Sequence, residues 1–139
     1  MSESAIRPIT SPLLRPPPGP WSNAIEVRAG ARQLFTCGLV GVRADGVVEA
    51  GIEAQTVRIF ENVQTLLKEA GMTMADVVKI TSYLLDLREQ PAYSKARAPY
   101  LGEARPAMTL LGIAQLAQPG LRLEVEVIAA RYDTAASAT

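Results

Sequence analysis

Apolar and polar residues alternate most regularly near the end of the chain. The pattern has four apolar and three polar members: Leu121, Leu123, Val125, Val127 and, between them, Arg122, Glu124, Glu126. A period of two is typical of a β-strand, because successive side chains point to opposite faces of the sheet. We therefore predict a strand over residues 121–131 with one face in the core. Glu124 lies on the other face, which is covered by water in one interpretation and lines a pocket in the other.

Helical spacing begins at Ile52. Apolar residues recur every three to four positions from there to Ala70, and Gly71 follows, as is common at the end of a helix. This predicts an amphipathic helix of about five turns. A second helix is predicted over residues 91–98, because proline is tolerated at the first helical position and Pro99 disfavours a helical residue before it.

Shorter apolar runs predict the remaining strands. Residues 24–28 and 34–39 flank a turn at Ala29–Gly30, which favours a hairpin. Further strands are predicted at residues 47–48, 76–85 and 106–113. The order predicts an α+β fold in which two helices cover one face of a mixed β-sheet. The uncovered face would be a large apolar patch, so we expect self-association.

The ends of the chain differ from its centre. Six of the ten prolines lie between Pro8 and Pro20, and proline cannot donate a backbone hydrogen bond to a sheet. Residues 1–20 are therefore predicted to be a proline-rich arm, either loose or packed on a neighbouring surface. The folded domain is predicted over residues 21–132, followed by a flexible tail of small and polar residues, 133–139.

Composition limits the possible functions. A chain of 139 residues with 48% hydrophobic and 20% charged residues fits one globular domain. Fourteen basic and fourteen acidic residues leave no net charge, so we expect neither a nucleic-acid partner nor a membrane partner. Without a membrane span or a secretion signal, the expected location is cytoplasmic.

The chain has no histidine, and Cys37 is its only cysteine. Within one chain this excludes a disulfide, a Cys/His zinc site and a Ser–His or Cys–His nucleophile pair. Acid–base chemistry would fall to carboxylates, lysine, tyrosine or the thiol. Cys37 itself has three interpretations: a small core residue, the wall of a pocket, or a nucleophile with a lowered pKa.

Several short motifs follow one another between Pro18 and Arg131: Gly19-Pro20-Trp21-Ser22, Gly38, Gln55, Asn62, Gly71, Asp76-Val77-Val78-Lys79, Arg105-Pro106-Ala107 with Thr109, and Glu124-Val125-Glu126-Val127-Ile128-Ala129. In their order and spacing these motifs resemble the RidA family, also called the YjgF/YER057c/UK114 or L-PSP family. The resemblance implies a chorismate-mutase-like fold assembled as a homotrimer, a trimeric barrel with pockets at the subunit interfaces.

The resemblance also implies an activity. Family members hydrolyse reactive enamines and imines to 2-keto acids and ammonia, without a metal or an organic cofactor. A glutamate positions the attacking water, and an arginine binds the substrate carboxylate through two hydrogen bonds. Glu124 matches that glutamate and is the predicted catalytic residue.

The residues at the other positions of the family pocket are predicted to bind the small-molecule substrate, together with Arg122 beside them: Trp21, Cys37, Gly38, Leu39, Ser94, Ala107, Met108 and Thr109. Met108 stands at the position of the family arginine, and losing such an arginine removes roughly 2 to 5 kcal/mol of anchoring. The substrate is therefore expected to differ from the usual small 2-imino acid. Arg122, about 7 Å along the strand from Glu124, is either a substitute anchor or a surface partner of a glutamate.

Two functions remain open. The first is a RidA-like hydrolytic deaminase, or another acid–base enzyme, acting on a small imine, enamine or related unsaturated compound. The second is a non-catalytic protein that binds a small apolar metabolite or a protein partner. The two differ in whether Glu124 is required. A ribonuclease, as the name L-PSP suggests, ranks third, since the neutral charge and the missing histidine give it no support.

Overall fold

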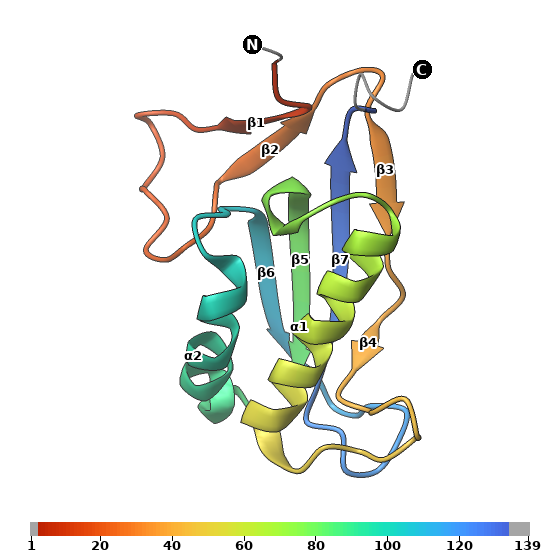
Figure 1. Cartoon of the computed structure of the whole chain (residues 1–139). Helices are drawn as coiled ribbons and strands as arrows, with labels where there is room; N and C mark the ends of the chain where they lie inside the picture. The colour runs from red at the N-terminus through yellow and green to blue at the C-terminus, as the bar shows by residue number, and fades with distance from the viewer. Residues whose placement is uncertain (1–2, 134–139) are drawn as a thin grey trace.

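The computed structural model describes residues 3–133, drawn in Figure 1. Nine strands and helices follow one another along this part of the chain: β1 (Ile6–Ile9), β2 (Ala24–Val27), β3 (Arg32–Phe35), β4 (Leu39–Val40), α1 (Gly51–Glu69), β5 (Val77–Leu84), α2 (Gln90–Leu101), β6 (Ala107–Gly112) and β7 (Leu123–Arg131). Single turns of 3₁₀-helix, Met74–Asp76 and Leu87–Glu89, precede β5 and α2. The predicted tail falls on residues 133–139, of which 134–139 lie outside the described residues.

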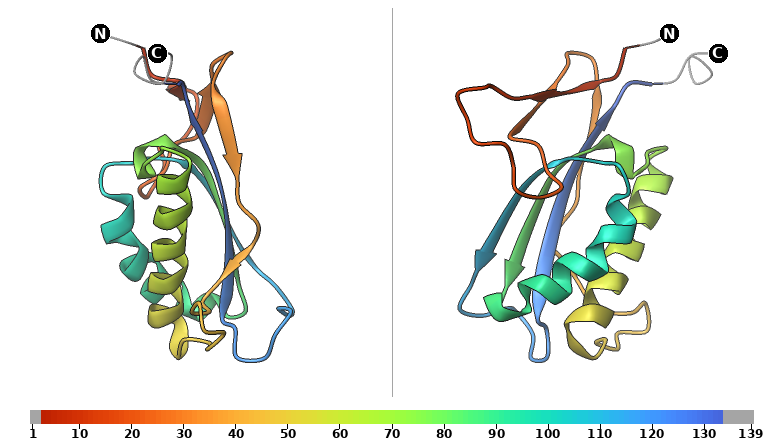
Figure 2. Two further views of the ribbon diagram at one scale, coloured as in Figure 1. Left: turned by 45° about the vertical axis from the view of Figure 1, so that its right-hand side comes forward. Right: turned by 90° about the vertical axis from the view of Figure 1, so that its left-hand side faces the viewer.

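The main sheet has the strand order β3–β7–β5–β6, and β4 also pairs with β7. Strand β7 is antiparallel to β3, β4 and β5, whereas β5 and β6 run parallel. Helices α1 and α2 pack side by side on one face of this sheet, as Figures 1 and 2 show. The predicted α+β fold, a mixed sheet with both helices on one face, is confirmed.

The core lies between the helices and the sheet. Leu123 and Val125 of β7 are fully buried on the helix-facing side, and the α1 residues Ile59, Phe60 and Val63 pack in the same cluster. The polar residues of β7 alternate with the buried ones and lie half-buried on the opposite face, which we call the open face. The alternation therefore predicted which face of β7 joins the core.

The predicted hairpin between residues 24–28 and 34–39 is wrong. Strand β2 pairs instead with β1, with Ile6 opposite Val27, in a separate two-stranded sheet. Strand β3 pairs with β7, where Leu34 lies opposite the buried Ala129 and packs against the core. Pairing with β7 extends the buried face of the sheet, which a two-stranded hairpin cannot do. The proline-rich arm is held in place through β1, whose edge position tolerates Pro8.

Two further boundaries differ from the predictions. Helix α2 continues through Pro99 to Leu101 instead of ending at Ala98. Leu101 is buried and the Tyr100 ring stacks on Phe60 with 5.8 Å between centroids, so packing offsets the backbone hydrogen bond that Pro99 cannot donate. The strand predicted at residues 47–48 is reduced to a single bridge between Val42 and Val48.

Neither α1 nor α2 is apolar enough over a sufficient length to span a membrane, and residues 3–133 contain no other α-helix.

Candidate functional site

Glu124 lies on the open face of the sheet, between β4 and β5. Its backbone is opposite Val40 of β4 and Tyr83 of β5. Its carboxylate extends over Gly38, because a Cβ at that position would overlap the Glu124 Oε2 and Cδ atoms. Because Gly38 has no side chain, there is space for the Glu124 carboxylate beside its backbone. The structure thus brings these two predicted site residues into contact.

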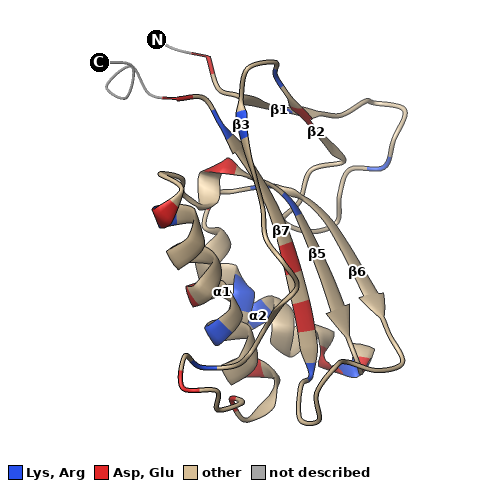
Figure 3. Ribbon diagram, turned by 90° about the vertical axis from the view of Figure 1, so that its right-hand side faces the viewer, with Lys and Arg blue, Asp and Glu red and all other residues tan. Residues whose placement is uncertain are grey.

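A tyrosine and a second glutamate lie beside Glu124. The Tyr83 hydroxyl donates a hydrogen bond of 2.7 Å to Glu126 Oε1. This hydrogen bond, followed by partial burial and the charges of Glu126 and Glu124, raises the pKa of Tyr83. The acidic positions of β7, red in Figure 3, form a band along the sheet. The sequence predictions missed Tyr83, although Lys79, Thr81 and Tyr83 alternate with buried residues and so indicate the open face.

The Tyr83–Glu126 hydrogen bond predicts a pH effect. The folded protein holds the phenol proton more tightly than the unfolded chain, whose tyrosine pKa is 10.0. The stabilisation is therefore fully present below pH 10 and is lost as the pH rises through the raised pKa. We expect Glu126→Gln to lower the pKa of Tyr83, measured by tyrosinate absorbance as a difference from the Tyr83→Phe protein. An unchanged Tyr83 titration in Glu126→Gln would contradict this prediction.

Arg122 is engaged within the chain. Its Nε donates to Glu89 Oε1 at 2.9 Å, its Nη2 contacts the same oxygen, and its backbone N–H donates to Gln55 Oε1 at 2.7 Å. Its charged partner is thus Glu89 on the segment before α2. The structure favours the ion pair over the role of a substitute anchor beside Glu124.

A second group of predicted site residues lines a cavity of about 150 Å³ between α2 and β6. Its walls are Trp21, Gln90, Ser94, Arg97, Met108, Thr109 and Leu110. Trp21 reaches the cavity because the Ser22 backbone N–H donates to the Pro106 carbonyl oxygen at 3.1 Å, and the Ser22 hydroxyl donates to the Arg105 carbonyl. We call this space the α2–β6 cavity.

The two groups of residues lie apart within one chain. Met108 is opposite Ile80 of β5 and packs against the helix-facing core, whereas Glu124 lies on the open face. Leu39 is opposite Val125 and packs against the same core, so its side chain does not share the open face with Glu124. One chain alone therefore does not place Met108 and Leu39 beside the Glu124 carboxylate.

The remaining predicted residues are Cys37 and Ala107. Cys37 is an exposed free thiol next to Gly38, so the interpretation of Cys37 as a core residue is wrong. Ala107 begins β6 opposite Lys79 of β5. The Lys79 ammonium donates to the Thr109 hydroxyl at 2.7 Å, one pleat further along β6.

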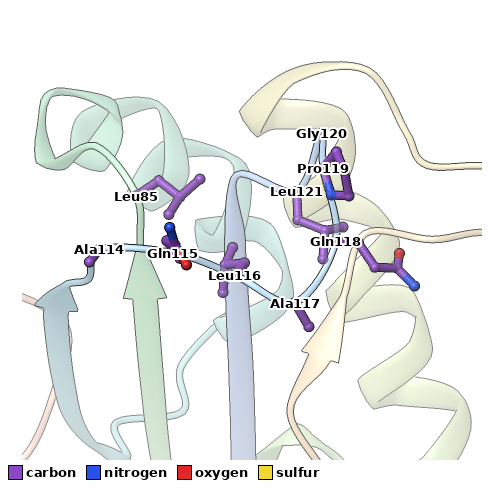
Figure 4. Close-up of a pocket in the computed structure, with 9 residues that line it drawn as sticks. All are labelled: Leu85, Ala114, Gln115, Leu116, Ala117, Gln118, Pro119, Gly120 and Leu121. Atoms are coloured by element: carbon purple, nitrogen blue, oxygen red, sulfur yellow. The ribbon is translucent and has the colours of Figure 1, made fainter.

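A separate hollow of about 330 Å³ lies at the end of β5 that is remote from the 3₁₀ turn Met74–Asp76. Leu85 and the loop 114–121 line it, as Figure 4 shows. All nine lining residues are apolar or carry a neutral amide, so this hollow offers no acid, base or charged anchor. The Glu124 region and the α2–β6 cavity are the better candidates. Within residues 3–133, no three His, Cys, Asp or Glu residues are grouped to hold a metal ion.

Comparisons with known proteins agree with the geometry. The model of the family described as Endoribonuclease L-PSP matches residues 13–131. A RutC family protein from Pyrococcus abyssi is 35% identical over 115 residues, which cover 81% of this chain and 87% of that protein. A protein of Dermatophagoides farinae named 2-iminobutanoate/2-iminopropanoate deaminase is 28% identical over 127 residues, 90% of this chain and 96% of that protein.

Solved structures show the same fold. The crystal structure of YyfB, a Rid family protein from Yersinia pestis, matches with a TM-score of 0.79 and 30% identity over 90% of this chain and 98% of that one. The chain therefore belongs to the Rid family, which is also known as the YjgF/YER057c/UK114 or L-PSP family.

Proposed function

We propose that this protein is a hydrolytic deaminase of small reactive imines and enamines, and that its pocket forms between copies of the chain. The observation that carries the proposal is the Glu124 carboxylate held over Gly38 on the open face of the sheet. The relative named 2-iminobutanoate/2-iminopropanoate deaminase supports it. We further propose that the protein works in the cytoplasm as a homotrimer, without a metal or an organic cofactor.

The proposed reaction needs one proton-transfer group next to the C=N bond. Water adds to the imine carbon while the Glu124 carboxylate accepts a proton from it. The protonated carboxyl then gives this proton to the nitrogen, which forms a carbinolamine. The carboxylate next takes the remaining hydroxyl proton and passes it to the same nitrogen, so that the C–N bond breaks, ammonia leaves and a carbonyl remains. An enamine enters the same sequence after protonation at carbon and loss of an N–H proton have converted it to the imine. Such positioned acid–base catalysis typically contributes about 10²- to 10⁴-fold in rate.

Assembly would bring the two groups of site residues together. The α2–β6 cavity lies at the β6 edge of the sheet, and Gly38 lies at the opposite edge, next to β4. Phe35 and Leu111, which are opposite Ile128 and Tyr83 on the open face, are 63% and 48% exposed. A neighbouring copy of the chain packed on that face would bury these apolar side chains. The same packing would place the α2–β6 cavity of one copy beside Glu124 of the other.

The test is ammonia release coupled to keto-acid detection, with freshly generated 2-iminopropanoate and 2-iminobutanoate as probes. We expect turnover by the native protein and a loss of about 100-fold or more in Glu124→Gln. Glu69→Gln, which removes an exposed carboxylate at the end of α1, is the matched control and should retain the native rate. Equal rates for Glu124→Gln and the native protein would overturn the proposal. Ligand binding without turnover would favour the non-catalytic alternative.

A further inference from the structure

Arg97 of α2 is buried and has no charged partner within residues 3–133. Its relative exposure is only 5%. None of the ion pairs found among residues 3–133 includes it. Its Nε atom is shielded from solvent and has no hydrogen-bond acceptor within that part of the chain. Buried charges in proteins are normally paired, because removing an ion from water is unfavourable.

The surroundings of Arg97 only partly offset that cost. Its guanidinium carbon lies 5.0 Å from the centroid of the Tyr93 ring, a favourable cation–π arrangement. The Tyr93 hydroxyl is hydrogen-bonded to the Ser82 hydroxyl on the strand beneath. The Tyr93 hydroxyl near Arg97 is a single neutral oxygen, whereas the planar fork of N–H groups of a guanidinium matches the two oxygens of a carboxylate. The site is therefore complementary to an anion that residues 3–133 do not supply.

Arg97 lines the α2–β6 cavity together with Met108, the residue at the family arginine position. Ser94 lies one turn earlier on the same face of α2 and adds a hydroxyl group, and Gln90 adds a neutral amide. Trp21 and Leu110 supply apolar walls. The cavity thus combines one buried cation, neutral polar groups and apolar surface. Its volume of about 150 Å³ fits one end of a small ligand, since whole ligand pockets measure about 300 to 1,000 Å³.

We propose that Arg97 binds the anionic group of a small carboxylate ligand in this cavity, in place of the arginine that Met108 replaces. The family pattern has its positive charge on β6, at the position of Met108, whereas this chain has it on α2, at Arg97. Both positions line the same cavity. This inference rests on the proposed function, because it names the substrate class of that site as small carboxylates. It also changes the expectation drawn from Met108 alone, since the carboxylate of the substrate keeps a charged partner.

Binding can be tested without turnover, because Trp21 lines the cavity and is the only tryptophan of the chain. The native protein is titrated with pyruvate and 2-oxobutanoate, stable keto-acid products, and with pyruvamide as a neutral match, while tryptophan fluorescence is recorded. We expect a saturable change with the two anions and a weaker response to the amide. Arg97→Met should weaken anion binding about tenfold or more, because a charge-assisted bond to the carboxylate is lost. Lys95→Met, an exposed cation on the same helix, is the matched control and should bind as the native protein does.

A second variant separates binding from folding. The double change Arg97→Met with Met108→Arg returns the charge to β6 and should recover most of the anion affinity. Without ligand, Arg97→Met should unfold at the same temperature as the native protein or higher, because an unpaired buried ion has been removed. If Arg97 had a purely structural role, this variant would unfold at a lower temperature and the double variant would not regain anion binding.

The proposal is overturned if Arg97→Met binds the keto acids as well as the native protein does, or if the native protein shows no saturable response. The second result would also arise if an acidic side chain of another copy already paired with Arg97. The two proposals can fail separately. Arg97-dependent binding with turnover independent of Glu124 refutes only the deaminase mechanism, whereas Glu124-dependent turnover with Arg97-independent binding refutes only the anion subsite.

Discussion

Gly38→Ala is expected to reduce ammonia release by about 100-fold or more, as strongly as Glu124→Gln. The new methyl group would occupy the space of the Glu124 carboxylate. Because this carboxylate is the end of a flexible side chain, it can rotate to another staggered position and relieve the overlap. The expected result is a displaced catalytic group in an otherwise unchanged fold.

The measurement is the steady-state rate of ammonia release, together with thermal unfolding of the same preparation. Gly38 does not have the positive φ that disfavours alanine, so its unfolding temperature should change little. Gly46→Ala is the opposite control. Gly46 has a φ of 87°, and an added methyl group would have no neighbour within 4 Å. This variant should therefore lose about 1 kcal/mol of stability but no activity. Full activity in Gly38→Ala would contradict the assigned position of Glu124.

Gln55→Ala is expected to lower the free energy of unfolding by about 3 kcal/mol or more, because three partly buried hydrogen bonds are lost at about 1 kcal/mol or more each. Gln55 is fully buried on α1. Its Nε2 donates to the carbonyl oxygens of Glu49 at 3.0 Å and Gly120 at 2.8 Å, and its Oε1 accepts from the Arg122 backbone N–H at 2.7 Å. One side chain thus ties the segment before α1 to the segment before β7.

Close packing around Gln55 leaves little room for the structure to rearrange after the substitution. A Cβ added at Gly41 would lie 2.6 Å from the Gln55 Cα, so the chain after β4 already contacts the helix backbone there. Such a loss is a large part of the stability of an ordinary domain, about 5 to 15 kcal/mol. Urea denaturation measures it, and Gln64→Ala on the exposed side of α1 is the matched control, expected to stay within about 0.5 kcal/mol of the native value. A loss below about 1 kcal/mol in Gln55→Ala would show that these hydrogen bonds are replaced by water.

The local pattern of apolar and polar residues was sufficient to predict a helix or strand, and its buried face, where the prediction concerns that element alone. The period of two over residues 121–131 predicted β7 and its buried face, and the helical spacing before Gly71 predicted α1 to within one residue at each end. The motif order also predicted the family. Side-chain direction follows from backbone geometry, so these features need no information on distant residues.

Two features of the site escaped prediction although signals for them exist. Tyr83 follows the alternation of β5, and its contact with Glu126 needed the pairing of β5 with β7. Tyr93, Arg97 and Leu101 recur every four residues and share the buried face of α2. A helical arginine is normally exposed, which is why its position on that face is informative.

The sequence by itself determined both helices, strands β5, β6 and β7, and the buried face of β7. Only the tertiary structure decided that β2 pairs with β1, that α2 runs through Pro99, and that Met108 and Glu124 lie on opposite faces of the sheet. The physical reason is that any strand offers the same backbone hydrogen bonds to every partner. The choice among partners is made by the apolar surface that each pairing buries, and that surface comes from residues far apart in the sequence.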